Sequence, residues 1–151
     1  MQHLSRTHRS AIIRTLTAIA AATALAGFAF PATAKAEQFQ SPSTNIRCFI
    51  GEGVDGAVSV ACEIAQHNWV APPRPDGCHL NWGSRFRLDQ AVGTRFDCYG
   101  QSLPTPDQTL AYNSSISHGT ITCYSETTDV TGSDTYTGHY FRISRESYAL
   151  G

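Results

Sequence analysis

The chain has 151 residues, 41% of them hydrophobic, and its 11 Lys and Arg nearly balance its 12 Asp and Glu. This charge excludes a strongly basic nucleic-acid-binding protein. The length suits one domain with a modest core.

The first 36 residues have the composition of a secretory signal peptide. Three arginines precede an uncharged apolar run from Leu16 to Phe30, and Ala34-Lys35-Ala36 offers small residues at both cleavage subsites. The run is shorter than the about 20 residues that span a bilayer. We therefore expect residues 1–36 to be removed and residues 37–151 to form a single secreted β domain, at the cell envelope or outside the cell, with no membrane span. That domain keeps seven Arg against twelve Asp and Glu, a net charge of −5, so nucleic acid is not an expected partner.

All five cysteines lie in the predicted mature part, and export places them in an oxidising compartment where pairing is the default. No cysteine has a C-x-x-C or a Cys/His spacing of the zinc type, so we expect disulfides and no metal. Because the number is odd, one cysteine is left without a partner in the chain. The five are Cys48, Cys62, Cys78, Cys98 and Cys123.

The first predicted hairpin joins a strand over 45–50 to a strand over 57–64, because apolar residues alternate in both. The register that opposes Ile46 to Ile64 also opposes Cys48 to Cys62, at a distance that suits a disulfide. The loop over 51–56 reads G-x-G-x-x-G. A strand follows it instead of a helix and its two acids would repel phosphate, so we expect a flexible loop and no cofactor.

A proline-rich connection over 65–77 follows, which we expect Trp69 to fix to the core. The central predicted hairpin pairs the run 78–88 with the run 94–99. Its register opposes Ser84 to Cys98 and leaves Cys78 about 20 Å further along its strand. Either the chain bends near Gly83, which would join Cys78 to Cys98, or these cysteines have other partners; we expect the bend.

Short strands are predicted over 110–112, 119–125 and 139–143, with a turn at Thr127-Thr128. This turn opposes Cys123 to Gly132, so Cys123 is the expected free thiol. It gives a monomer if buried and a covalent dimer if exposed, and a Gly132→Cys variant is expected to form a stabilising bridge with it. With no helical period after the signal peptide, the pattern predicts an all-β fold, a small disulfide-stapled sandwich or partly open barrel of short antiparallel strands.

Several short motifs lie along the predicted mature chain. They are Phe39-Gln40-Ser41-Pro42-Ser43-x-Asn45-Ile46-x-Cys48, Cys62-Glu63-Ile64, Trp69 with Pro72-Pro73, Cys78 with Trp82-Gly83, Cys98, Leu110-x-Tyr112, Gly119 to Cys123 and Gly138-His139-x-Phe141. In these motifs the chain resembles a family of small secreted actinobacterial proteins, common in mycobacteria, that carry a cysteine-containing domain of unknown function. The resemblance implies location and fold style, and no activity.

The chain departs from this family at three places. Members usually have a sixth cysteine after a Val-Thr pair, where this chain has Gly132, which implies that Cys123 has lost its partner. Thr44 and Tyr140 stand where the resemblance leads us to expect glycine.

No hydrolase motif such as G-x-S-x-G or H-E-x-x-H is present. On the face of the central hairpin that carries its odd-numbered residues, the predicted register places Arg85 opposite Asp97 and Arg87 opposite Arg95. Either nearby carboxylates neutralise these arginines, or Arg85, Arg87 and Arg95 form a small anion site. We predict an exported, non-enzymatic binding or interaction domain with an unknown ligand. The alternatives are a small envelope hydrolase, with a His near a Ser or Asp, and a purely structural envelope component.

Overall fold

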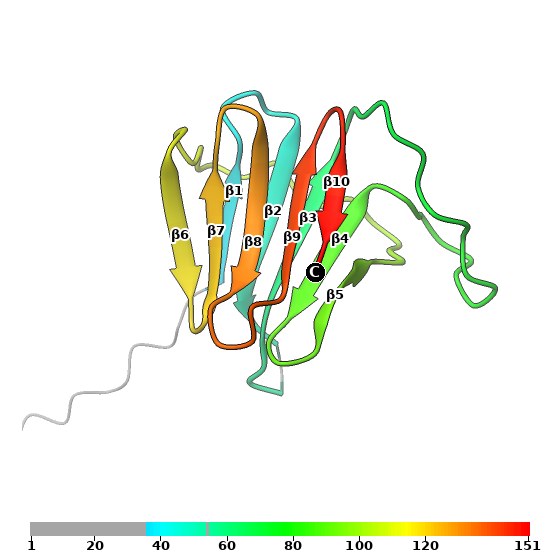
Figure 1. The fold of residues 1–151 in the computed structure, drawn as a ribbon, viewed down its shortest axis with the longest axis horizontal. Helices are drawn as coiled ribbons and strands as arrows, with labels where there is room; N and C mark the ends of the chain where they lie inside the picture. The colour runs from blue at the N-terminus through cyan, green and yellow to red at the C-terminus, as the bar shows by residue number, and fades with distance from the viewer. Residues whose placement is uncertain (1–35, 54) are drawn as a thin grey trace, which may run out of the picture. The chain divides into compact units, whose positions relative to one another are not determined.

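The computed structural model describes residues 36–53 and 55–151, which form ten β-strands and no helix (Figure 1). The strands make two five-stranded antiparallel sheets packed as a sandwich, so the predicted all-β sandwich is confirmed. The expected signal-peptide helix falls on residues outside the described ones. The strands are β1 (Glu37–Gln40), β2 (Ile46–Glu52), β3 (Val58–Ile64), β4 (Arg85–Asp89), β5 (Gly93–Phe96), β6 (Ser114–His118), β7 (Ile121–Ser125), β8 (Asp129–Asp134), β9 (Tyr140–Ser144) and β10 (Tyr148–Leu150).

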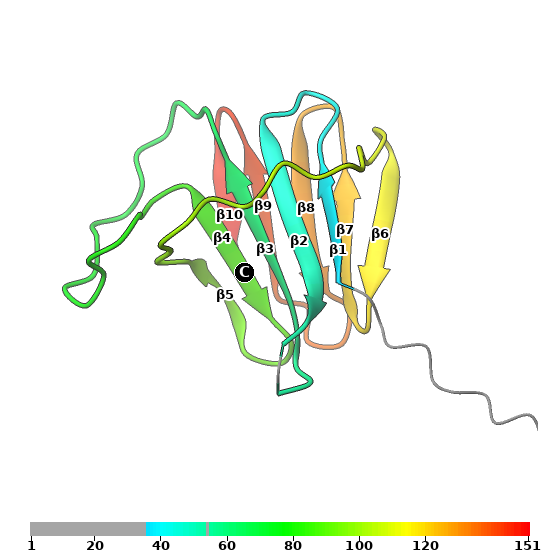
Figure 2. The ribbon, with the colours of Figure 1, turned by 180° about the vertical axis from the view of Figure 1, so that it is seen from behind.

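Each sheet is a meander in which every strand pairs with its neighbours in sequence. The first sheet has the order β1-β2-β3-β4-β5 and the second the order β10-β9-β8-β7-β6. The only connection between the two sheets in the described part of the chain is the long segment over 97–113. It runs across the outer face of the first sheet, in front of β4, β3 and β2 in Figure 2. One outer face of the sandwich is therefore covered, and no strand-linking segment crosses the other (Figure 1).

The first sheet has the register that the alternation of apolar residues predicted. Cys48 lies opposite Cys62 and the two are joined by a disulfide with a Cα–Cα distance of 4.1 Å. Phe86 lies opposite Phe96, with ring centroids 4.5 Å apart in the core. The inward side chains of these strands are almost fully buried because period-two alternation places them all on one face.

The predicted bend before β4 is present at Gly83, whose φ of +96° favours glycine. A Cβ at this position would lie 2.8 Å from the Cβ of Ala71. The bend returns the preceding residues toward β5, so that Cys78 and Cys98 are bonded with a Cα–Cα distance of 5.8 Å. The strand itself begins only at Arg85, and Leu80, which the alternation placed on the buried face, is 53% exposed.

The observed strands differ from the predicted ones at three other places. Residues 37–40 form β1, where no strand was predicted. Residues 110–112 form no strand, and β6 lies directly after them, where serines gave no clear alternation. The predicted strand over 119–125 begins only at Ile121, because Gly119 occupies the tight turn that follows β6 with a φ of +56°.

The second sheet has the predicted register at its central hairpin. Cys123 on β7 lies opposite Gly132 on β8, and Ser125 lies opposite Val130. Cys123 is a free thiol with no exposed surface. Its burial in an apolar core raises the pKa of the thiol to about 12.

Trp69 fixes the proline-rich connection to the core, as its place in the sequence suggested. Its indole N–H donates to the carbonyl of Ser144 at 3.0 Å, which links the connection to the second sheet. Its ring packs edge-on against Phe86 and Tyr148, at centroid distances of 5.7 and 4.7 Å. One side chain therefore closes the open side of the sandwich where β5 and β10 end the two sheets.

Asp134, at the end of β8, links the two sheets at the opposite end of the sandwich. Its carboxylate is fully buried and accepts hydrogen bonds from the backbone N–H of Ala91 at 3.1 Å, from Tyr136 N–H at 3.0 Å and from the Thr137 hydroxyl at 2.9 Å. Burial opposes ionisation of this carboxyl, but the hydrogen bonds outweigh it and lower its pKa to about 2. Because Ala91 lies in the β4–β5 turn, the carboxylate ties the two sheets together.

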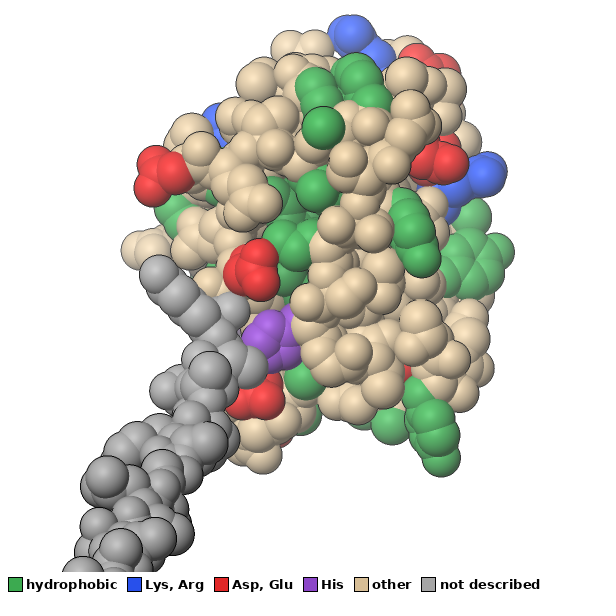
Figure 3. Space-filling view, turned by 90° about the vertical axis from the view of Figure 1, so that its left-hand side faces the viewer, with side chains coloured by type: hydrophobic (Ala, Val, Ile, Leu, Met, Phe, Trp, Pro, Cys, Tyr) green, Lys and Arg blue, Asp and Glu red, His purple; other side chains and the backbone are tan. Residues whose placement is uncertain are grey.

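The two intramolecular disulfides indicate an oxidising, extracytoplasmic environment. In the part of the chain that the structure describes, no helix is long and apolar enough to cross a membrane. Seen from the β6 side, the surface shows mostly uncharged atoms with separate acidic and basic side chains (Figure 3).

Candidate functional site: a polar cleft at one end of the sandwich

A cleft of about 570 Å³ opens at the end of the sandwich where the β1–β2, β7–β8 and β9–β10 turns meet, the upper end in Figure 1. Both sheets contribute to it. The residues that line it are Ser41, Ser43, Thr44, Asn45, Ile46, Ala65, Gln66, Tyr112, Glu126, Thr127, Thr128, Asp129, Arg145 and Glu146.

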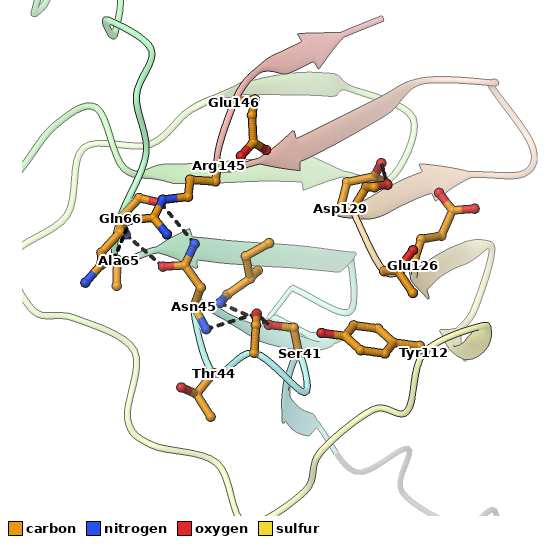
Figure 4. Close-up of a pocket in the computed structure, with 14 residues that line it drawn as sticks. Ser41, Thr44, Asn45, Ala65, Gln66, Tyr112, Glu126, Asp129, Arg145 and Glu146 are labelled. Carbon is orange, nitrogen blue, oxygen red and sulfur yellow. Dashed lines mark hydrogen bonds between the residues drawn. The ribbon is translucent and has the colours of Figure 1, made fainter.

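One wall is built by a network around Asn45 and Gln66 (Figure 4). The side-chain amide of Asn45 donates to the carbonyl of Gln66 at 2.9 Å, and its oxygen accepts from the N–H of Gln66 at 2.9 Å. The Arg145 guanidinium donates to the side-chain oxygen of Gln66 at 3.1 Å. The two sheets are thus linked across the back of the cleft, and the wall is held before any ligand arrives.

The β1–β2 turn forms the rim beside this wall. The Ser41 hydroxyl accepts from the N–H of Ile46 at 3.2 Å and lies 2.9 Å from the Ser43 hydroxyl. Thr44 has a φ of +60°, a conformation that glycine adopts at less cost. The family resemblance led us to expect glycine here, and the turn geometry gives the physical reason.

The opposite wall comes from the β7–β8 turn and from Tyr112 (Figure 4). Asp129 accepts from the hydroxyls of Thr128 at 3.0 Å and Thr131 at 3.3 Å, which holds its carboxylate in place. The Glu126 side chain makes no hydrogen bond or ion pair with another described residue, and Tyr112 is 38% exposed. This wall therefore presents carboxylate oxygens and a phenol that are free to bind a ligand.

Three carboxylates and one guanidinium make the cleft acidic. Glu126, Asp129 and Glu146 face it together with Arg145, whose hydrogen bond to Gln66 holds it at the back wall. No group of three or more His, Cys, Asp or Glu side chains in the described ranges has the geometry of a metal site. The arrangement favours a ligand that donates hydrogen bonds, and positive charge over negative.

No histidine of the described part of the chain lines this cleft, although His67 directly follows the cleft residue Gln66. His67 stacks on Trp69 with ring centroids 3.6 Å apart, His118 is buried at the end of β6, and His139 lies beside Gly93. None of the residues that line the cleft is a histidine. The hydrolase alternative required a His near a Ser or Asp in a concave pocket, and the cleft does not provide one.

The three arginines predicted as an anion site lie on the outer face of the first sheet, with the register that was predicted. Arg85 is only 8% exposed and pairs with Glu63 at 2.7 Å. Its guanidinium also donates to the carbonyl of Gln101 at 2.6 Å and lies 3.8 Å from the centre of the Tyr99 ring. Arg85 thus holds the 97–113 segment onto the sheet, with little of its own surface exposed.

Arg87 and Arg95 share the carboxylate of Asp89, with an Arg87–Asp89 distance of 2.7 Å. Burial opposes ionisation of Asp89, but its hydrogen bonds to both arginines lower its pKa. A neutralising carboxylate, which was one of the two alternatives, is therefore in contact with both guanidinium groups. Anion binding by Arg85, Arg87 and Arg95 stays a prediction.

No pattern in the sequence predicted the cleft. Its residues come from five separate segments, and each segment taken alone has the ordinary composition of a turn. Two of the motifs that carry the family resemblance contribute to the cleft: the motif over 39–48 supplies Ser41, Ser43 and Asn45, and Leu110-x-Tyr112 supplies Tyr112.

A family model, described as a family of unknown function (DUF6636), matches residues 12–150. No curated protein and no solved structure matches the chain.

Proposed function

The chain belongs to the DUF6636 family of unknown function, and we propose that it is an exported, non-enzymatic binding domain whose ligand occupies the polar cleft. The observation that carries this proposal is the cleft itself, in which a fixed wall faces unpaired carboxylates. A rigid polar concavity with free acceptors is typical of small-molecule sites.

The ligand is a small polar molecule that carries hydroxyl groups and a positive charge. Glu126 and Glu146 offer acceptors with no partner among the described residues, and the back wall offers amide groups. The Tyr112 ring supplies an apolar surface at the rim. An amino sugar combines hydroxyl donors, a cationic amine and an apolar ring face, and it is the simplest probe of this class.

Export by the signal peptide and action at the cell envelope or outside the cell belong to the same proposal. The disulfides and the resemblance to small secreted actinobacterial proteins support it. A purely structural envelope component remains the alternative, and it has no need of an open cleft with unpaired carboxylates.

Titration of the protein with glucosamine, N-acetylglucosamine and glucose 6-phosphate tests the proposal. We expect glucosamine to bind most tightly and glucose 6-phosphate not to bind, because the cleft repels anions. Glu126→Gln and Glu146→Gln are each expected to weaken the binding of glucosamine about fivefold, which corresponds to about 1 kcal/mol.

Glu52→Gln is the matched control, because Glu52 is an exposed acid at the end of β2 that does not line the cleft. It changes the net charge by the same amount and is expected to leave the affinity unchanged. Equal affinity for all three sugars, or equal losses in the cleft and control variants, would contradict the proposal.

A further inference from the structure

No segment within residues 36–53 and 55–151 crosses the outer face of the second sheet, and its side chains differ in kind from those on the outer face of the first. Directly opposed residues of antiparallel strands share a face, so the pairing registers give the side chains of this face row by row. One row is Ser115, Tyr124, Thr131, Arg142 and Ala149, and the next is Ser117, Thr122, Ser133 and Tyr140.

These two rows contain five Ser or Thr residues, two tyrosines and one charged residue. Thr122 is buried and its hydroxyl lies 2.8 Å from that of Ser117, and the Thr131 hydroxyl donates to Asp129, so Ser115 and Ser133 carry the hydroxyls without a partner among the described residues. The corresponding rows of the first sheet contain Arg47, Glu63, Arg85, Arg87 and Arg95, and the 97–113 segment crosses them (Figure 2). The second sheet thus presents a nearly uncharged, hydroxyl-rich surface with aromatic rings. Such a surface suits a neutral ligand that offers hydroxyl groups and apolar ring faces.

The two tyrosines are exposed although both belong to strands, Tyr124 as the last residue but one of β7 and Tyr140 as the first residue of β9. Tyr124 on β7 is 47% exposed and Tyr140 on β9 is 39% exposed. Tyr140 is held beside Gly151, which exchanges two backbone hydrogen bonds with it at 2.8 and 2.9 Å. Tyr124 has Ser115 and Thr131 as its direct neighbours across the strands, and neither is large enough to cover its ring.

The spacing of the tyrosines defines the length of the ligand. They lie two strands apart and two residues out of register, which places their Cα atoms about 12 Å from each other at the usual strand spacing and rise. That separation is too long for one sugar ring and suits two or three linked rings in an extended chain. The hydroxyls of Ser133 and Thr131 lie on the strand between the two tyrosines.

We propose that this face, defined by Tyr124, Tyr140 and the hydroxyl rows between them, binds a neutral, extended β-linked glycan chain. The two tyrosines stack on sugar rings and the Ser and Thr hydroxyls bind the ring hydroxyls. This surface is separate from the cleft, and it gives the domain a way to attach to an envelope or extracellular polysaccharide while the cleft stays open.

Affinity electrophoresis of the exported protein, produced from the full chain, tests this in native gels that contain hydroxyethyl cellulose. We expect the neutral extended glycan to retard the protein. Tyr124→Ala and Tyr140→Ala are each expected to raise the dissociation constant roughly tenfold through the loss of one stacked ring. Tyr124→Phe keeps the ring and is expected to keep most of the retardation.

Tyr136→Ala is the matched control, because Tyr136 is 82% exposed but lies in the β8–β9 turn. For this variant and for the cleft variant Glu126→Gln, the retardation relative to each variant's own mobility in a glycan-free gel is expected to equal that of the unaltered protein, so failure of the cleft proposal is distinguishable. No retardation by hydroxyethyl cellulose, equal retardation by dextran, or unchanged retardation of both alanine variants with melting curves that show a folded protein would overturn the proposal.

Discussion

The ring of Phe141 lies over Gly132 in the core of the second sheet, so closely that a Cβ at residue 132 would lie 2.5 Å from the ring's Cζ atom. Gly132 on β8 is opposed by Cys123 on one side and by Phe141 on the other. The aromatic ring thus fills the space that a side chain on β8 would occupy. Glycine is needed here for close approach and not for an unusual backbone angle.

This contact overturns the expectation that Gly132→Cys would stabilise the fold through a bridge to Cys123. A side chain at residue 132 must displace the Phe141 ring, and overpacking of this kind costs about 1–3 kcal/mol. We expect Gly132→Ala and Gly132→Cys to lower the free energy of unfolding by that amount in urea denaturation. Phe141→Leu in the same chain is expected to restore part of the loss, whereas equal or greater stability of either single variant would show that the ring is free to move.

Cys123 is expected to be unreactive in the folded protein. It has no exposed surface and burial raises its pKa to about 12, so little thiolate forms at pH 8. A thiol reagent such as dithionitrobenzoate should titrate no thiol in the native protein and one per chain in urea. Non-reducing electrophoresis should show a monomer, because the exposure on which a covalent dimer would depend is absent; a fast-reacting native thiol would contradict the burial.

Asp134 is expected to make stability fall with acid. Its folded pKa of about 2 is below the unfolded value near 3.9, so its contribution is complete above about pH 5 and is lost as the pH falls toward 2. The size of this contribution is about 2–3 kcal/mol. Asp134→Asn should reduce the free energy of unfolding at pH 7. Urea denaturation of both proteins at several pH values should show that the free energy of unfolding falls less steeply between pH 5 and pH 2 in the variant. An equally steep fall with pH in both proteins would contradict the assignment.

Arg85 and Arg87 lie on the same strand and are expected to behave differently. Arg85→Ala leaves the carboxylate of Glu63 without its ion-pair partner under the 97–113 segment and should cost about 3 kcal/mol or more. Arg87 lies in a more exposed pair, so Arg87→Ala should change stability by less than about 0.5 kcal/mol. Thermal melts of the two variants compare them, and equal losses would show that the segment is held by other contacts.

Arg87→Glu tests the anion-binding hypothesis for the arginine face. If Arg87 and Arg95 bind anions, inorganic phosphate should raise the melting temperature of the unaltered protein and not that of the variant. Absence of any phosphate effect on the unaltered protein would leave Asp89 as the partner of both arginines.

The sequence predicted those parts of the fold that follow from alternation and from close pairs of strands. The registers of Cys48 with Cys62 and of Cys123 with Gly132 depend on short hairpins, in which apolar residues on one face leave one pairing. It did not predict β6, because Ile116 is the only apolar residue of this strand and the inward face holds Ser114 and His118 beside it. Such a strand is defined by its neighbour β7.

The cleft was beyond prediction for a related reason. Asn45, Gln66 and Arg145 are far apart in sequence, and they meet only because β1–β5 and β6–β10 form two sheets whose ends coincide. Nothing in a single turn indicates which other turn lies beside it. Likewise, the alternation placed Arg85 on an outer face, and only the path of the 97–113 segment shows that this part of the face is covered.

The most direct test of the central claim is a titration of the isotope-labelled protein with glucosamine, followed by two-dimensional ¹H–¹⁵N NMR. We expect the chemical-shift changes to concentrate at the backbone amides of Asn45, Gln66, Tyr112, Glu126 and Arg145 and at the side-chain amides of Asn45 and Gln66, and to saturate with one dissociation constant. Changes confined to the arginine face, or no saturable change at the cleft, would contradict the assignment of the cleft as the binding site.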